Sequence, residues 1–161
     1  METADYLSVF NRQGAGTAFP AEDALVLPDW SAESWGRLLQ CTVPQPFHAN
    51  EVVLKRGTTD RALFFIVAGD LEVGVTQIDG VSLIPLARIS AGSIVGEQSF
   101  FDGHSRSANV WAVSSGEMLR LDFAEFEKFS LAEPALARDL LFAVARVMSA
   151  RMRNTTFRLR R

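Results

Sequence analysis

The spacing of apolar residues changes along the chain, and each spacing predicts a different kind of structure. Between residues 31 and 40 they recur three and four positions apart, which predicts a short amphipathic helix. From residue 51 to residue 121 they alternate with polar residues in short runs that end at glycine, and Asp79-Gly80 predicts a tight hairpin. The strands are expected at residues 51–55, 63–67, 71–76, 81–89, 110–113 and 118–121. Short strands at this spacing predict an antiparallel barrel or sandwich.

Helical spacing returns after the last strand. A short helix is expected over residues 122–129, and a long helix over residues 134–153, which contain no proline or glycine after the first position. The apolar face of the long helix is wider than one contact needs, which predicts a homodimer through this helix. Residues 1–28 lack sustained periodicity and are expected to form an N-terminal arm, so the folded domain is assigned to residues 29–161. The expected fold is mainly β, an antiparallel jelly-roll β-barrel with flanking helices and a long C-terminal helix.

Composition narrows the class of protein. The chain has 161 residues, 48% of them hydrophobic, and a net charge of −3, which fits one globular domain without a general affinity for polyanions. Cys41 is the single cysteine, so no intrachain disulfide can form. His48 and His104 show no spacing typical of metal ligands or a catalytic pair, so neither a metal nor an enzymatic activity is expected. The start is acidic and the longest apolar run, residues 62–68, is short, so a cytoplasmic protein without a membrane span is expected.

The segment with the most distinctive chemistry is residues 94–108, which is too polar for a strand. Gly96 permits close approach of a ligand to the backbone, and the turn after it offers free amide groups. Arg106 and Ser107 add a permanent cation and a hydroxyl, while the Glu97 carboxylate can accept a hydrogen bond from a sugar hydroxyl. The residues therefore favour a ligand with one anionic group beside a neutral hydroxyl. The alternative is a structural ion pair between Glu97 and Arg106.

This segment resembles the phosphate-binding cassette of cyclic nucleotide-binding domains, the type found in catabolite activator proteins and in regulatory subunits of protein kinase A. The positions that match the cassette are Gly96, Glu97, Arg106, Ser107 and Ala108. The resemblance extends over residues 30–153 and implies that Glu97 accepts from the ribose 2′-hydroxyl, that Arg106 pairs with the cyclic phosphate, and that Gly96 and Ser107 add amide and hydroxyl groups. Secondary contacts are expected from Val95, Gln98 and Ala108.

The resemblance also implies a sensor or regulatory domain without a cofactor, whose ligand, cyclic AMP in preference to cyclic GMP, moves the C-terminal helix. Candidates for a lid over the base, chosen because they lie near the end of that helix, are Arg151, Met152 and Thr155. Only residues 154–161 follow the expected helix, which leaves no room for a helix-turn-helix domain, so sequence-specific DNA binding is not expected of this chain alone.

Two other functions fit parts of the sequence. A domain of the same fold that binds no nucleotide would serve as an oligomerisation or docking module, although Glu97 and Arg106 then have no evident purpose. A cupin-type enzyme shares the short strands and turns, but two isolated histidines do not supply its clustered metal ligands.

Overall fold

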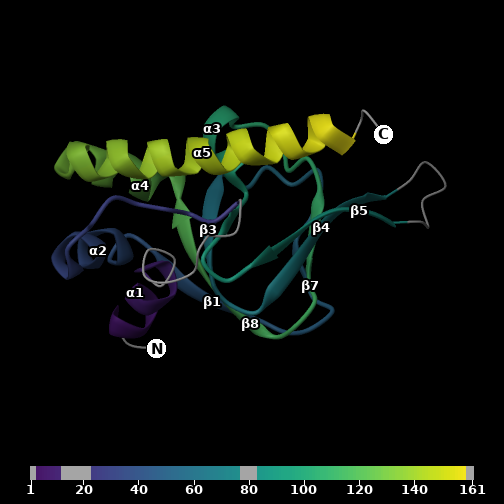
Figure 1. Cartoon of the computed structure of the whole chain (residues 1–161), viewed down its shortest axis with the longest axis horizontal. Helices are drawn as coiled ribbons and strands as arrows, with labels where there is room; N and C mark the ends of the chain where they lie inside the picture. The colour runs from purple at the N-terminus through teal and green to yellow at the C-terminus, as the bar shows by residue number, and fades with distance from the viewer. Residues whose placement is uncertain (1–2, 12–22, 77–82, 159–161) are drawn as a thin grey trace. The chain divides into compact units, whose positions relative to one another are not determined.

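The computed structural model describes residues 3–11, 23–76 and 83–158, which form two compact units (Figure 1). A helical unit is built from both ends of the chain, Met1–Cys41 and Ala124–Arg161, and a β unit is built from Thr42–Phe123. The β unit is therefore inserted, in chain order, between the two halves of the helical unit.

The strands of the β unit pair antiparallel in two four-stranded sheets, ordered β1-β8-β3-β6 and β2-β7-β4-β5. Their bounds are β1 Val43–Phe47, β2 Val52–Leu54, β3 Ala62–Ala68, β4 Asp70–Thr76, β5 Leu83–Ser90, β6 Ile94–Val95, β7 Asn109–Ala112 and β8 Gly116–Asp122. Side chains from both sheets form one buried cluster, including Phe64 and Ile66 from β3 and Leu71 from β4. The fold is thus the expected jelly roll, with two packed sheets rather than one closed ladder.

Strand β3 lies at the centre of this core. Its run of apolar residues is buried from Ala62 to Val67, as expected for a strand covered on both faces. It pairs with β8 along one edge and with β6 along the other, so it lies beside the segment that enters the cassette. The start of β3 is therefore the part of the sheet best placed to hold cassette residues.

Strand β1 lies outside the strands expected from the sequence, the first of which is residues 51–55, and it contains Pro44 and Pro46. Among the described strands, β1 pairs with β8 alone and forms the edge of its sheet. A proline lacks an amide hydrogen and is tolerated on an edge strand when that position faces away from the neighbouring strand. The prolines therefore mark an edge and do not end the sheet.

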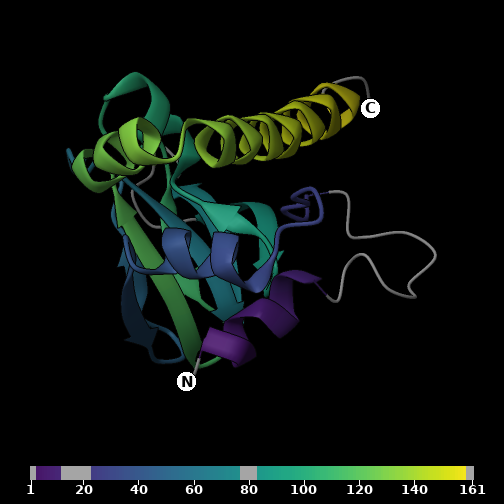
Figure 2. The ribbon, with the colours of Figure 1, turned by 90° about the vertical axis from the view of Figure 1, so that its left-hand side faces the viewer.

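The helical unit contains α1 Thr3–Asn11, α2 Ala32–Leu39, α4 Phe123–Ala132, whose first residue belongs to the β unit, and α5 Pro134–Arg158. Helix α1 lies within the segment expected to be an arm, and α1 and α2 lie side by side (Figure 2). The ring of Phe10 stacks on that of Trp35 at 5.4 Å, and Trp30 meets Trp35 edge to face at 5.4 Å. Aromatic pairs at this separation stabilise a fold beyond the area they bury.

Polar contacts join the N-terminal half of the helical unit to α5 and the residue before it. The Trp30 indole donates to Asp139 at 3.3 Å, Arg37 pairs with Glu133, and Arg151 pairs with Asp23 at 3.4 Å. Residues later in the first segment contact residues earlier in the second, so residues 23–37 and 133–151 are antiparallel. Helix α5 extends five residues beyond its expected end at Arg153.

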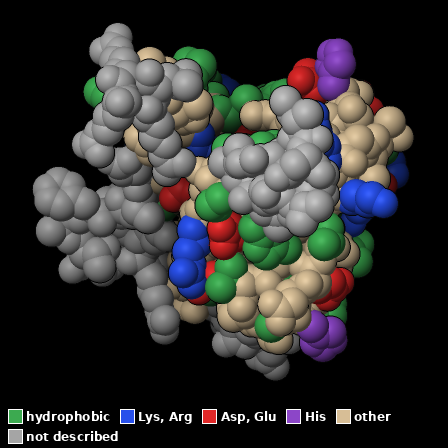
Figure 3. All heavy atoms as spheres, turned by 90° about the vertical axis from the view of Figure 1, so that its right-hand side faces the viewer, with side chains coloured by type: hydrophobic (Ala, Val, Ile, Leu, Met, Phe, Trp, Pro, Cys, Tyr) green, Lys and Arg blue, Asp and Glu red, His purple; other side chains and the backbone are tan. Residues whose placement is uncertain are grey.

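The expected hairpin at Asp79-Gly80 lies outside the described residues. None of the helices in the described parts of the chain has the length and apolar character needed to cross a bilayer. Where Figure 3 draws described residues, acidic, basic and apolar side chains are interspersed.

Candidate functional site

The cassette positions, Gly96 to Ala108, lie between β6 and β7. The first of them, Gly96, has a left-handed backbone conformation. Gly96 has φ of 86° and directly precedes α3, Glu97–Asp102. A Cβ atom at this position would lie 2.5 Å from Arg106 Nη1 and 2.8 Å from the carbonyl oxygen of Ala62. Both the backbone angle and the lack of space therefore require glycine.

The Arg106 side chain is 3% exposed and is held against the start of β3. Its Nη1 donates to the Gly96 carbonyl at 2.9 Å, and its Nη2 donates to the Ala62 carbonyl at 2.9 Å and to Asp60 Oδ2 at 3.0 Å. The backbone of Arg106 is fixed as well, because its amide donates to the Thr58 carbonyl at 2.8 Å. The guanidinium thus has one orientation set by the fold.

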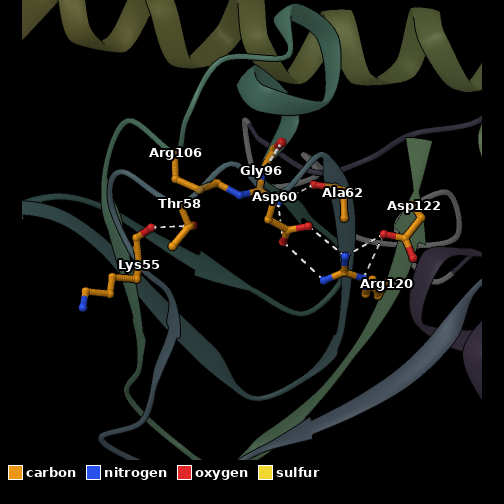
Figure 4. A network of polar contacts seen from close by, with 8 residues as sticks. All are labelled: Lys55, Thr58, Asp60, Ala62, Gly96, Arg106, Arg120 and Asp122. Atoms are coloured by element: carbon orange, nitrogen blue, oxygen red, sulfur yellow. Dashed lines mark hydrogen bonds and ion pairs between the residues drawn. The ribbon is translucent and has the colours of Figure 1, made fainter. Parts of the chain in front are cut away.

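Asp60 is shared between two arginines (Figure 4). Besides Arg106, it accepts from Arg120 Nη2 at 2.7 Å and Nη1 at 3.2 Å, and Arg120 also pairs with Asp122 at 2.6 Å. Partial burial raises the pKa of Asp60, but hydrogen bonds and the charges of Arg106 and Arg120 outweigh it and hold that pKa below its usual value. Asp60 is therefore ionised at neutral pH.

One donor of Arg106 has no acceptor. The Nε atom is buried and makes no hydrogen bond within the described parts of the chain, although both Nη atoms are bonded. A buried N–H without an acceptor costs about 1–3 kcal/mol. An anionic oxygen placed beside Nε would remove that cost and form a charge-assisted hydrogen bond.

The other expected cassette residues lie close to Arg106 in the chain and in the fold. Glu97 is 8% exposed at the first position of α3. The Ser107 hydroxyl donates to Gln98 Oε1 at 2.6 Å, which places two of the expected residues in contact. Val95 is buried in β6, where it pairs with Phe64, and Ala108 is half-buried just before β7.

The expected lid residues belong to the helical unit. Arg151 is paired with Asp23 and its side chain is 19% exposed, whereas Met152 is 70% exposed. The Thr155 hydroxyl donates to the Arg151 carbonyl at 3.0 Å, an ordinary contact within a helix. Their role as a lid stays a prediction.

Sequence reasoning missed Asp60 and Arg120. Asp60 is 46 residues from Arg106 and 60 from Arg120, and each residue belongs to a run that looks like an ordinary strand boundary. The one available signal was an acidic residue two positions before the buried run of β3. Among the described residues, no three of His, Cys, Asp or Glu gather closely enough to hold a metal ion.

Comparison with known proteins places these residues in a family. The chain is 32% identical over 103 residues to the "Putative potassium channel protein" of Rhodopseudomonas palustris, covering 64% of this chain and 24% of that protein. It is 25% identical over 114 residues to the cAMP-activated global transcriptional regulator Vfr of Pseudomonas aeruginosa, covering 68% of this chain and 51% of Vfr. The chain thus spans a quarter to a half of the length of these relatives.

A solved structure supports the same fold. A cyclic nucleotide-binding domain from Methylobacillus flagellatus superposes with a TM-score of 0.79 at 22% identity, over 97% of this chain and 81% of that one. The family model described as "Cyclic nucleotide-binding domain" matches residues 44–132, a range that contains the whole cassette, Asp60 and Arg120. The chain belongs to the cyclic nucleotide-binding domain family.

Proposed function

We propose that this chain binds a cyclic nucleotide through Gly96, Glu97, Arg106 and Ser107 and acts as a sensor or regulatory domain. The observation that carries the proposal is the buried Nε of Arg106, whose missing acceptor a cyclic phosphate oxygen would supply. The proposed role is binding and regulation, without a catalytic step.

Charge favours a ligand with a single negative charge. The cluster of Arg106, Arg120, Asp60 and Asp122 is balanced in formal charge, so it has no excess of cations for a polyphosphate. The Glu97 carboxylate beside it would further repel a highly charged chain. A cyclic phosphodiester carries one charge, and its ribose hydroxyl is a suitable partner for Glu97.

Cyclic AMP is proposed in preference to cyclic GMP. Vfr, whose name describes activation by cAMP, supports this preference. The Ser107 hydroxyl, a group that also suits guanine, already donates its hydrogen to Gln98. Titration with both nucleotides decides between them.

The regulatory output is proposed to involve the long helix. Large apolar side chains are exposed along α5, namely Phe142, Met152 and Phe157, whereas Leu140 and Val147 are buried. We propose that the exposed side chains form a homodimer contact and that nucleotide binding moves α5. The alternative function, a docking module without a nucleotide, uses the same helix but needs no buried donor at Arg106.

The test is a thermal shift series with cyclic AMP, cyclic GMP and 2′-deoxy cyclic AMP. Cyclic nucleotide should raise the melting temperature of wild type by mass action and leave Arg106→Ala unmoved, while Glu97→Ala should lose discrimination against the 2′-deoxy ligand. Arg106→Ala is expected to melt lower even without ligand, because it leaves Asp60 with one arginine. The shift on adding ligand is therefore the decisive quantity.

Arg120→Ala is the matched control, since it also removes an arginine from Asp60 but leaves Arg106 in place. It should melt lower and still respond to nucleotide. Arg106→Lys covers the case in which Arg106→Ala does not fold. A wild-type protein free of bound ligand that shows no shift with either nucleotide, and no heat of binding, would leave the docking module as the function.

A further inference from the structure

Arg61, the residue after Asp60, holds the far end of the cassette helix. Its Nε donates to the Phe100 carbonyl at 3.0 Å and its Nη2 donates to the Phe101 carbonyl at 3.2 Å. The carbonyl groups in the last turn of a helix receive no hydrogen bond from within the helix, and a cation near them is favourable. Arg61 therefore satisfies two carbonyl groups at the end of α3.

The same guanidinium lies on the ring of Phe123. Its Cζ is 3.3 Å from the ring centroid, and the Phe123 amide donates to the Arg61 carbonyl at 3.0 Å. The Phe123 ring also meets Phe100 edge to face at 5.3 Å. Arg61 thus contacts α3 and Phe123 at once, through both its side chain and its backbone.

Phe123 has a particular place in the chain. It is the last residue of the β unit and the first residue of α4, and Ala124 already belongs to the helical unit. A displacement of Phe123 is therefore passed on to α4 by the peptide chain itself. Asp60, the neighbour of Arg61, holds Arg106. Two consecutive residues thus fix both the arginine expected to meet phosphate and the end of the cassette helix.

We propose that Arg61 is a positioning residue that couples the cassette to α4, by keeping α3 and Phe123 together when the cassette shifts on nucleotide binding. This proposal rests on the proposed function, because the ligand supplies the shift. Arg61 acts through α3 and Phe123 and is assigned no ligand contact. Its role is separate from that of Arg106, whose guanidinium faces Gly96 and Asp60.

The test measures hydrogen–deuterium exchange of backbone amides in residues 97–102 and 124–132, with and without saturating cyclic AMP. In wild type, nucleotide should change exchange in both segments. In Arg61→Gln the change at residues 97–102 should remain, and the change at 124–132 should fall to a small fraction of its wild-type size. Because ligand saturates each protein, a weaker affinity alone does not produce this pattern.

Matched variants separate coupling from loss of structure. Arg56→Gln removes the same charge from an exposed residue five positions earlier and should behave as wild type. Arg61→Lys keeps a cation but not the two-pronged donation, so it should retain part of the change at 124–132. Phe123→Leu removes the ring and should reproduce Arg61→Gln. Affinity should weaken by no more than about fivefold in Arg61→Gln, as expected for an exposed cation on a ring.

The outcomes are distinguishable. If wild type binds no nucleotide, the proposed function is wrong. If wild type binds but exchange at 124–132 does not change, or changes equally in wild type, Arg61→Gln and Phe123→Leu, the role of Arg61 is wrong and the proposed function stands. If Arg61→Gln does not fold, Phe123→Leu gives the decision, because it is expected to lose the same change at 124–132, and Arg61→Lys should lie between it and wild type.

Discussion

Replacing Gly96 by alanine tests whether the fold holds Arg106 in place for its ligand. The residue has φ of 86°, and alanine in this region costs about 1–2 kcal/mol. The new Cβ would also lie 2.5 Å from Arg106 Nη1, so the guanidinium must leave the Gly96 carbonyl. Losing a hydrogen bond to a charged group adds about 1.5–3 kcal/mol. The free energy of unfolding should therefore fall by about 2.5–5 kcal/mol, which lowers the melting temperature by roughly 5–20 °C.

Gly57 provides a matched control within the same unit. It has φ of 85°, and an added Cβ meets nothing within 4 Å. In Gly57→Ala only the backbone conformation is strained, so the melting temperature should fall by about 2–8 °C. Scanning calorimetry gives both midpoints, and calorimetric titration gives the affinity for cyclic AMP. Gly96→Ala should also bind more weakly, whereas Gly57→Ala should bind as wild type. Equal midpoints for the two variants, or full affinity in Gly96→Ala, would refute the argument that Gly96 positions Arg106.

Three further predictions concern acid stability, assembly and the lid. Because the pKa of Asp60 is lowered in the folded state, its ion pairs stabilise the fold above the unfolded-state pKa of about 3.9, and that stability is lost as the pH falls through the folded pKa. Between pH 7 and pH 3 the melting temperature should therefore fall less steeply in Asp60→Asn than in wild type. Parallel curves for the two proteins would contradict this. Phe142→Glu with Met152→Glu should give a folded monomer by light scattering, unless wild type is already monomeric at high micromolar concentration. Deleting residues 150–161 should weaken nucleotide binding, and an unchanged affinity would place the lid elsewhere.

Those parts of the fold that depend on local patterns were predictable from the sequence. Alternation located β4 and β7, and a run without proline or glycine located α5. The candidate cassette could also be located, because Gly96, Glu97 and Arg106 lie within one short segment whose residue types are unusual together, and their role in binding stays a prediction. Each of these features is encoded by residues that are close in the chain.

The features that were missed depend on pairing between distant segments. Pro44 can lie in a strand only where its nitrogen faces away from the neighbouring strand. The order of strands in the whole sheet decides whether this is so. Asp60 is a partner of Arg106 only because β3 lies beside β6 and β8. A local sequence pattern contains no information on these strand pairings, so it cannot distinguish Asp60 from an acidic residue in an exposed turn.

The insertion of the β unit into the helical unit has a consequence for folding during synthesis. Domains generally fold as units from the N-terminus as the chain emerges. The β unit, Thr42–Phe123, is complete before any part of α5 exists, whereas the first half of the helical unit has been made but lacks its other half. The hydrogen bond from Trp30 to Asp139 and the ion pair between Asp23 and Arg151 can form only after α5 has been synthesised. A nascent chain that has emerged as far as Phe123 would therefore carry the whole β unit together with an aromatic helical half whose partners have not yet emerged.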